Sequence, residues 1–168
     1  MPAKDARIIA SKLRNIGPLA ISVGGGEPLL HPELYDIIHL LAKDHFPVMI
    51  CNGSLMTPER ARELWSSGLY EVSISVDYAD PAKHDQQRSF PGAFERACAG
   101  LEMLARTRLK PEQRVHMISV VMDDNLEEIE PLIKLAGTMG ITYLVTLYSH
   151  GRGTKTARAP KRDVSRHL

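Results

Sequence analysis

Cysteine is scarce in this 168-residue sequence, which contains only Cys51 and Cys98. Long apolar runs are also missing, and without about 18 consecutive apolar residues the sequence predicts no membrane span. The amino-terminal residues do not form a signal peptide, because Asp5, Arg7 and Lys12 interrupt the apolar positions there. These absences favour a cytoplasmic protein in a reducing compartment, where the two thiols need not form a disulfide.

The net charge of +1 favours no particular partner, and the 43% hydrophobic content fits one globular domain, which we place at residues 1–150. From Gly151 onward, six Arg or Lys residues stand against Asp163 alone, which leaves this segment at +5 and the preceding residues at −4. Because the segment has almost no apolar residues, we expect residues 151–168 to be a basic, disordered tail. A solvated terminus is favoured over an arm that binds nucleic acid.

Helical and strand patterns alternate along the rest of the chain. Helices are predicted over residues 6–15, 32–44, 57–68, 94–105 and 125–140. Short apolar strands are predicted over residues 19–23, 47–51, 70–76, 114–122 and 141–148. A long polar stretch, residues 77–91, is predicted to connect the third strand to the following helix. This alternation predicts an α/β fold of parallel strands with right-handed crossovers, in a barrel or partial barrel.

The connections differ in length at the two ends of the predicted sheet. Turns from helix to strand are short, whereas stretches from strand to helix are longer and carry the reactive residues. These residues are Glu27, Asn52, Asp77 to Ser89, Asp123 to Asn125, and Ser149-His150. Parallel barrels gather their functional residues at the carboxyl ends of the strands, so we place the site there.

A glycine-rich segment follows the first predicted strand directly. Glycines let a ligand approach the backbone closely, and Glu27 then adds a carboxylate to the carbonyl oxygens of Gly25 and Gly26. Such acceptors suit a cationic amine better than a phosphate. A Rossmann phosphate loop is a poor alternative, because its helix begins on the glycines and Pro28 and Pro32 prevent that. Two simpler interpretations stay open: the glycines only turn the chain, or Glu27 caps a backbone amide.

Five ordered motifs resemble the core of radical S-adenosylmethionine (radical SAM) enzymes, from about residue 6 to residue 153. They are Gly24-Gly25-Gly26-Glu27-Pro28-Leu29-Leu30, then Asn52-Gly53, then Ile74-Ser75-Val76-Asp77, then His84-Asp85 with Arg88 and Gly92-Ala93-Phe94, and finally Asp123-Asp124-Asn125. The resemblance implies a partial (βα) TIM-like barrel. It also implies that the family's first strand and its C-x-x-x-C-x-x-C loop are missing from this chain, which leaves residues 19–23 as an open apolar edge. The chain is similar to a truncated piece of a SPASM-type member.

The resemblance implies a role for each matching residue in binding S-adenosylmethionine (SAM). Gly25, Gly26, Glu27 and Pro28 match the segment that receives the SAM amino group, whose protons need acceptors. Arg88 is expected to pair with the methionine carboxylate.

The remaining matches concern the nucleoside. Ser75 and Asp77 match the strand end that meets the ribose hydroxyls, Asn52 and Asn125 are expected to line the pocket, and Val120 with Val121 would give adenine an apolar wall. Simpler interpretations exist here too. Asn52-Gly53 forms a plain turn, Asp77 ends a strand, Arg88 is a solvated surface residue, and Asn125, with Glu128, caps the last predicted helix.

The family's second cofactor is a [4Fe–4S] cluster held by three thiolates, whose electron splits SAM and releases a 5′-deoxyadenosyl radical. Cys51 and Cys98 are predicted to be small core residues, and two thiols cannot supply that ligand set. No metal ligands are expected among the scattered histidines, and Trp65 is expected to pack in the core. We therefore expect this chain to be inactive alone.

Two alternatives stay open: a protein that binds SAM or another nucleotide without redox chemistry, and an inactive remnant. The substrate of the parent enzyme is not fixed by the sequence, and a peptide or a cofactor precursor is compatible with it.

Overall fold

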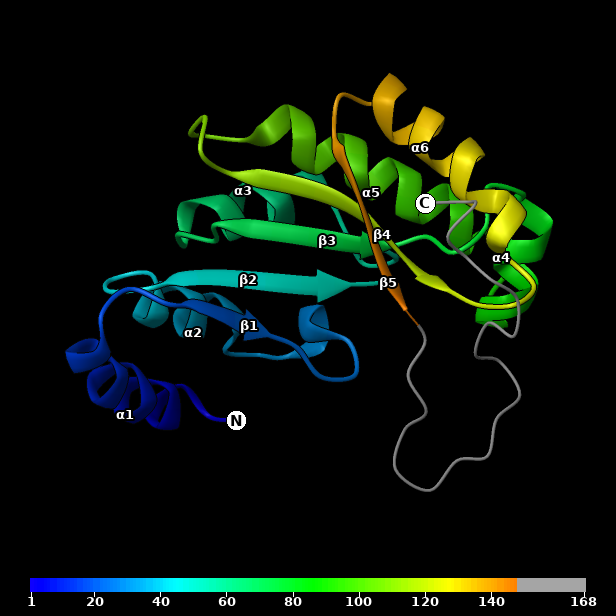
Figure 1. The fold of residues 1–168 in the computed structure, drawn as a ribbon. Coiled ribbons are helices and arrows are strands. Elements are labelled where there is room, and N and C mark those ends of the chain that lie inside the picture. Colours follow the sequence, from blue (N-terminus) through cyan, green and yellow to red (C-terminus); the bar gives the residue numbers. More distant parts are fainter. Residues whose placement is uncertain (148–168) are drawn as a thin grey trace.

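The computed structural model describes residues 1–147, which form one five-stranded parallel sheet in the order β1-β2-β3-β4-β5 (Figure 1). The strands are β1 (Ala20–Val23), β2 (Phe46–Cys51), β3 (Glu71–Ser75), β4 (Arg114–Val121) and β5 (Thr142–Leu147). The α-helices are α1 (Ala3–Leu13), α2 (Leu34–Leu41), α3 (Pro58–Ser66), α4 (Pro81–Arg88), α5 (Ala93–Thr107) and α6 (Ile129–Thr138). Short 3-10 helices are η1 (Arg14–Ile16), η2 (Pro28–Leu30) and η3 (Leu126–Glu128). The predicted α/β class and the five parallel strands are confirmed.

One prediction about the elements is wrong, because the polar stretch 77–91 contains the helix α4. The sequence hides this helix because it has no apolar stripe, and His84 is its only buried residue. Its start signal is nevertheless present: Asp80 is the N-cap, accepts from the N–H groups of Ala82 and Lys83, and precedes Pro81 at the first helical position. The predicted tail, Tyr148 and Ser149-His150 lie outside the described residues.

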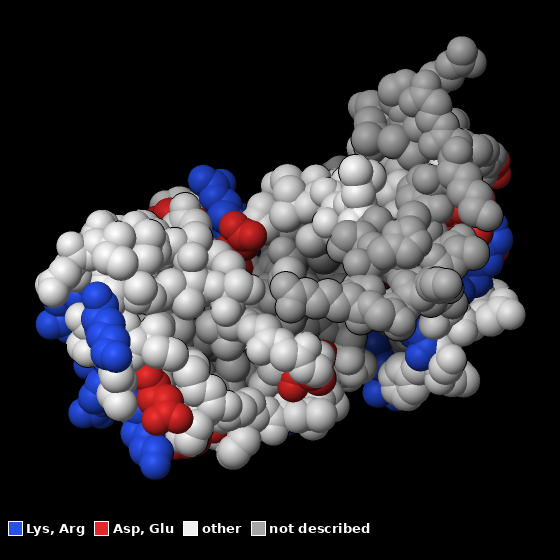
Figure 2. All heavy atoms as spheres, turned by 60° about the horizontal axis from the view of Figure 1, so that its bottom comes forward, with Lys and Arg blue, Asp and Glu red and all other residues white. Residues whose placement is uncertain are grey.

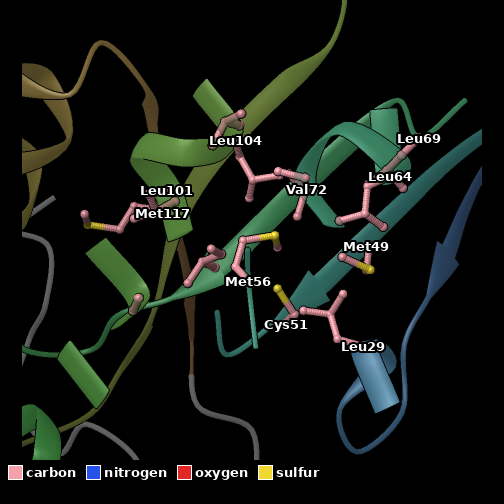
Figure 3. Close-up of a cluster of buried hydrophobic side chains, with 14 of the residues drawn as sticks. Leu29, Met49, Cys51, Met56, Leu64, Leu69, Val72, Leu101, Leu104 and Met117 are labelled. Carbon is pink, nitrogen blue, oxygen red and sulfur yellow. The ribbon is translucent and has the colours of Figure 1, made fainter. Parts of the chain in front are cut away.

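The main hydrophobic core lies between the sheet and the helices on one of its faces (Figure 3). Its side chains come from the strands β2, β3 and β4 and from the helices α2, α3, α5 and α6. Trp65 of α3 is 2% exposed, and its Nε1–H donates to the carbonyl oxygen of Leu104 over 3.1 Å. The prediction that Trp65 packs in the core is confirmed. This packing fixes where α3 and α5 lie, and so fixes the loops that leave β2 and β3.

The opposite face of the sheet is less covered. In β2, Met49 and Cys51 are buried, whereas Phe46 and Ile50 are 46% and 44% exposed. The sheet is strongly twisted, and β5 crosses the direction of β2 and β3 steeply (Figure 1). Among the described residues, β1 forms one edge of the sheet, as the sequence predicts for residues 19–23. The described chain is thus an incomplete barrel whose strands end side by side.

Candidate functional site

The glycine segment Gly24–Gly26 joins the end of β1 to η2. The carbonyl oxygens of Gly25 and Gly26 accept no hydrogen bond from residues 1–147. A Cβ atom added at either position would meet no atom within 4 Å, so both residues border open space. That space is a hollow of about 450 Å³. Its lining includes the glycine segment with Glu27, Pro28 and His31, and mainly apolar residues of α1, β1 and α2. Free carbonyl oxygens beside a hollow are suitable acceptors for an ammonium group.

Glu27 holds the glycine segment against the next strand. Its Oε1 accepts from the N–H of Leu29 over 3.2 Å, and its Oε2 accepts from the N–H of Asn52 over 3.0 Å. The capping interpretation of Glu27 is therefore confirmed, and Pro28 begins η2. An ionised carboxylate has about four acceptor sites, so these two bonds orient the group and leave acceptor capacity.

The turn at Asn52-Gly53 brings β2 close to α5. Gly53 has φ +76°, and a Cβ there would lie 3.1 Å from the Cα of Ala97 and 3.0 Å from Ile74. Only glycine fits this position without displacing the helix. Asn52 Oδ1 accepts from the N–H of Ser54, as in a plain Asx turn, so the turn interpretation of Asn52-Gly53 is confirmed.

Asp77 is the centre of a hydrogen-bond network at the end of β3. This side chain is 3% exposed; Oδ2 accepts from Arg88 Nη2 over 2.6 Å, and Oδ1 accepts from the N–H of Val120 over 2.8 Å. The backbone of Asp77 donates to His84 Nδ1 and accepts from Asn125 Nδ2. Asp77 thus ties the end of β3 to α4 and β4, and it holds Arg88 in place.

A second hollow, of about 390 Å³, lies at the ends of β2 and β3. It is lined by Asn52, Ser54, Ser75, His84, Arg88, Phe90 and Ala93. Arg88 is 30% exposed, and its Nε is buried without an acceptor among the described residues. Glu27 and Arg88 therefore line two different hollows. Asn52 links them, because it lines the second hollow and its N–H donates to Glu27.

Asp85 was not singled out as a site residue from the sequence, and its role is structural. Its Oδ2 accepts from the N–H of Gly92 over 2.5 Å, and its Oδ1 accepts from the N–H of Phe94 over 3.0 Å. These backbone bonds at the start of α5 hold the pKa of Asp85 below its usual range. The sequence feature that could have indicated a role for Asp85 was its place beside His84 in the fourth motif.

Asn125 stands at the N-cap position of η3, but its side chain does not make the predicted capping contact. Instead Oδ1 accepts from the N–H of Met122, and Nδ2 donates to the carbonyl oxygens of Asp77 and Val120. The correction has a physical reason: an amide with two donors and an acceptor can brace two strand ends, a contact between distant residues that local spacing does not reveal. Asn125 lines neither of the two hollows described above.

Glu128, predicted as part of that cap, braces the neighbouring loop. Its Oε2 accepts from the N–H groups of Ala79 and Asp80, and its Oε1 accepts from Lys83 Nζ over 2.7 Å. Although burial acts to raise the pKa of Glu128, these bonds lower it below its usual value.

Only one of the two valines expected to form an apolar wall for adenine is accessible to a ligand. Val121 is 0% exposed and packs with Leu126 and Ile129 on the helix-covered side. Val120 is half-buried and lies on the other face, because neighbouring residues of a strand point to opposite faces. The prediction for Val121 is therefore wrong.

The thiols do not fit a cluster. Cys51 is 4% exposed, and Figure 3 shows its side chain within the core, between Leu29 and Met56. Burial raises the pKa of Cys51 to about 12 and that of Cys98, half-buried on α5, to about 11. Within residues 1–147, no three His, Cys, Asp or Glu side chains are grouped to hold a metal ion. A [4Fe–4S] cluster would need thiolates from beyond these 168 residues.

These thiol environments make a direct prediction. In the native chain at pH 8, we expect a soluble thiol reagent to modify Cys98 slowly and Cys51 at least about tenfold more slowly, because the thiolate is the reactive form. Mass spectrometry of the labelled peptides over time measures both rates. Urea should make the two rates equal, and equal rates in the native chain would contradict the burial of Cys51.

Figure 2 shows one face of the molecule, on which basic and acidic side chains are interspersed among uncharged residues. No helix within residues 1–147 combines the length and apolar character needed to cross a membrane.

Comparison with known proteins identifies the family of this chain. Residues 1–136 match the Radical SAM superfamily. The chain is 32% identical over 167 residues to an AdoMet-dependent heme synthase of Methanosarcina barkeri. The aligned region covers 98% of this chain and 47% of that protein. The chain is also 28% identical over 156 residues to the mycofactocin maturase MftC of Mycobacterium tuberculosis. This aligned region covers 92% of this chain and 39% of that protein.

A solved structure has the same fold. Streptococcus suis SuiB bound to S-adenosylmethionine superposes with a TM-score of 0.78 at 20% identity, over 97% of this chain and 37% of SuiB. The chain spans less than half the length of each of these three proteins. Its sheet is a partial TIM-like barrel. The match over most of its length shows that this chain belongs to the radical SAM superfamily.

Proposed function

We propose that this chain is the SAM-binding part of a radical SAM enzyme and that it recognises the methionyl group through two adjoining hollows. The observation that carries the proposal is the pair of carbonyl oxygens on Gly25 and Gly26, which accept no hydrogen bond within residues 1–147, beside the fixed carboxylate of Glu27. An ammonium group has three donors and no acceptor, so it fits this set of oxygens. Backbone oxygens bordered by glycine allow the close approach that such bonds require.

Arg88 supports binding of the opposite charge of the methionyl group. Asp77 takes one guanidinium nitrogen, Nη2, whereas the buried Nε has no acceptor among residues 1–147. A carboxylate that enters the second hollow would give Nε that acceptor, and charge-assisted bonds of this kind are stronger than neutral ones. The hydroxyl of Ser75 and the polar groups of Asn52 line the same hollow and are proposed to meet the ribose. Val120 is proposed to contact adenine.

The enzyme to which this part belongs is proposed to cleave SAM reductively and release a 5′-deoxyadenosyl radical, which is chemistry that an iron–sulfur cluster supplies. The thiols of this chain do not fit such a cluster, so its own residues are assigned only binding and orientation. The substrate class is proposed to be a peptide or a cofactor precursor. Relatives are named for heme synthesis and mycofactocin maturation, and SuiB is also known bound to the precursor peptide SuiA.

A second candidate is binding of SAM without redox chemistry, favoured by the core position of Cys51. Calorimetric binding does not separate the two candidates. Cleavage of SAM to 5′-deoxyadenosine under reducing conditions, by the enzyme with its cluster, does separate them.

Replacement of Arg88 tests the proposed carboxylate contact. We expect Arg88→Ala to weaken SAM binding about 10- to 100-fold, because a hydrogen bond to a charged group is lost. Arg88→Lys should recover part of the affinity, since it restores the charge without the planar fork. Isothermal titration calorimetry on the full chain measures both, with Arg62→Ala on the exposed face of α3 as the matched control. Equal affinities for wild type, Arg88→Ala and Arg62→Ala would reject the assignment.

A further inference from the structure

The structure assigns a ligand-binding role to His84: we infer that its Nε2–H donates to the carboxylate of the methionyl group beside Arg88. This inference rests on the proposed function, because it names a second residue for the same hollow. The roles proposed above do not include His84.

The position of His84 is set by α4. His84 and Arg88 are four residues apart, so they share one face of the helix. Both line the second hollow, and His84 is only 1% exposed. Because the ring is so deeply buried, the surrounding protein fixes its position beside Arg88. Phe94 of α5 packs edge-on against the ring, with centroids 6.0 Å apart and an angle of 71° between planes.

The protonation state of the ring follows from its hydrogen bonds. Nδ1 accepts from the N–H of Asp77 over 3.3 Å, so this nitrogen carries no proton in the bonded state. The neutral ring then carries its proton on Nε2. Burial, followed by the charge of Arg88, lowers the pKa of His84, which keeps the ring neutral near pH 7. No described residue accepts a hydrogen bond from Nε2.

The hollow therefore presents two donor positions from side chains one turn apart on α4: Arg88 Nε, which is buried, and His84 Nε2–H. Neither has an acceptor among residues 1–147. Asp77 already orients both side chains, one through its carboxylate and the other through its N–H. Two oriented donors without acceptors match the two oxygens of a carboxylate.

Two variants separate the ligand contact from the structural bond to Asp77. In His84→Asn the side-chain oxygen stands near the position of Nδ1 and can still accept from the N–H of Asp77, but the Nε2–H donor is gone. In His84→Gln the longer amide can restore a donor near Nε2. The probes are SAM and decarboxylated SAM, which lacks the acceptor in question, titrated by calorimetry into the full chain.

We expect His84→Asn to bind SAM about tenfold more weakly and decarboxylated SAM as the wild type does, because one donor to a charged group is removed. His84→Gln should recover part of the loss. Unchanged SAM affinity in His84→Asn would overturn the inference, and so would an equal loss for both probes, which indicates a structural role. If the wild type binds SAM and Arg88→Ala weakens it while His84→Asn does not, only the inference fails. No saturable heat with the wild type would reject the proposed function itself.

A measurement on the unmodified chain covers the case in which His84→Asn does not fold. The imidazole ¹⁵N shift of His84 Nε2, followed by NMR, should move on addition of SAM and stay in place on addition of decarboxylated SAM. The same displacement with both probes, or none with SAM, would contradict the inference.

Discussion

Glu27→Gln is expected to weaken SAM binding by about tenfold or more, with a further loss in Glu27→Ala. The substitution removes the negative charge that faces the ammonium group, and a hydrogen bond to a charged group contributes about 1.5–3 kcal/mol. It also places an amide donor against one of two backbone donors, the N–H of Leu29 or the N–H of Asn52. We therefore expect the free energy of unfolding to fall by about 1–2 kcal/mol as well.

Calorimetry with SAM and urea unfolding, on the same preparations, measure these two effects separately. Glu112→Gln is the matched control, because Glu112 is exposed on a turn that leads from helix to strand, at the opposite end of the sheet. It should change neither quantity by more than about 0.5 kcal/mol. Wild-type affinity in Glu27→Gln would show that the glycine segment does not receive the amine.

Asp77→Ala should lower the free energy of unfolding by about 2–4 kcal/mol. The change removes the acceptor for the N–H of Val120 and the partner of Arg88, and it leaves a cation partly buried without its counter-charge. The lower part of that range applies if the guanidinium turns to solvent, since the Arg88 side chain is 30% exposed.

SAM affinity should also fall in Asp77→Ala, because Arg88 loses the contact that orients it. The control is Asp36→Ala on α2, whose exposed carboxylate interacts with the start of its helix and should cost less than about 1 kcal/mol. Urea unfolding followed by circular dichroism measures both variants. A loss in Asp77→Ala no greater than in Asp36→Ala would mean that the network around Asp77 does not stabilise the fold.

The sequence predicted the sheet well because its strands are short apolar segments that are easily recognised. Residues 47–51 and 114–122 are bounded by turns or polar residues, and they form β2 and β4 within one residue of the predicted ends. Helix α4 was missed because seven of its eight residues are not buried, so no apolar period marks it. Asp80 followed by Pro81 was the local signal that would have revealed it.

The site was harder to predict because its residues are fixed by contacts between distant segments. Local spacing assigned Asn125 to a helix cap, but the amide instead joins the end of β3 to β4. The network that joins Asp77, Val120 and Arg88 is likewise invisible in the sequence. The family resemblance assigned Glu27 and Arg88 to the same amino-acid group of one ligand, whereas the structure places them at two hollows linked by Asn52. Their roles in binding SAM stay predictions.

The central claim is that this chain binds both the amino group and the carboxylate of SAM. A crystal structure of the chain soaked with SAM tests it most directly. The account predicts the methionyl nitrogen about 3 Å from the Glu27 carboxylate and the Gly25 or Gly26 carbonyl oxygen, with the carboxylate about 3 Å from Arg88 Nε. Density for the ligand with its amine away from the glycine segment, or with its carboxylate in solvent, would contradict it.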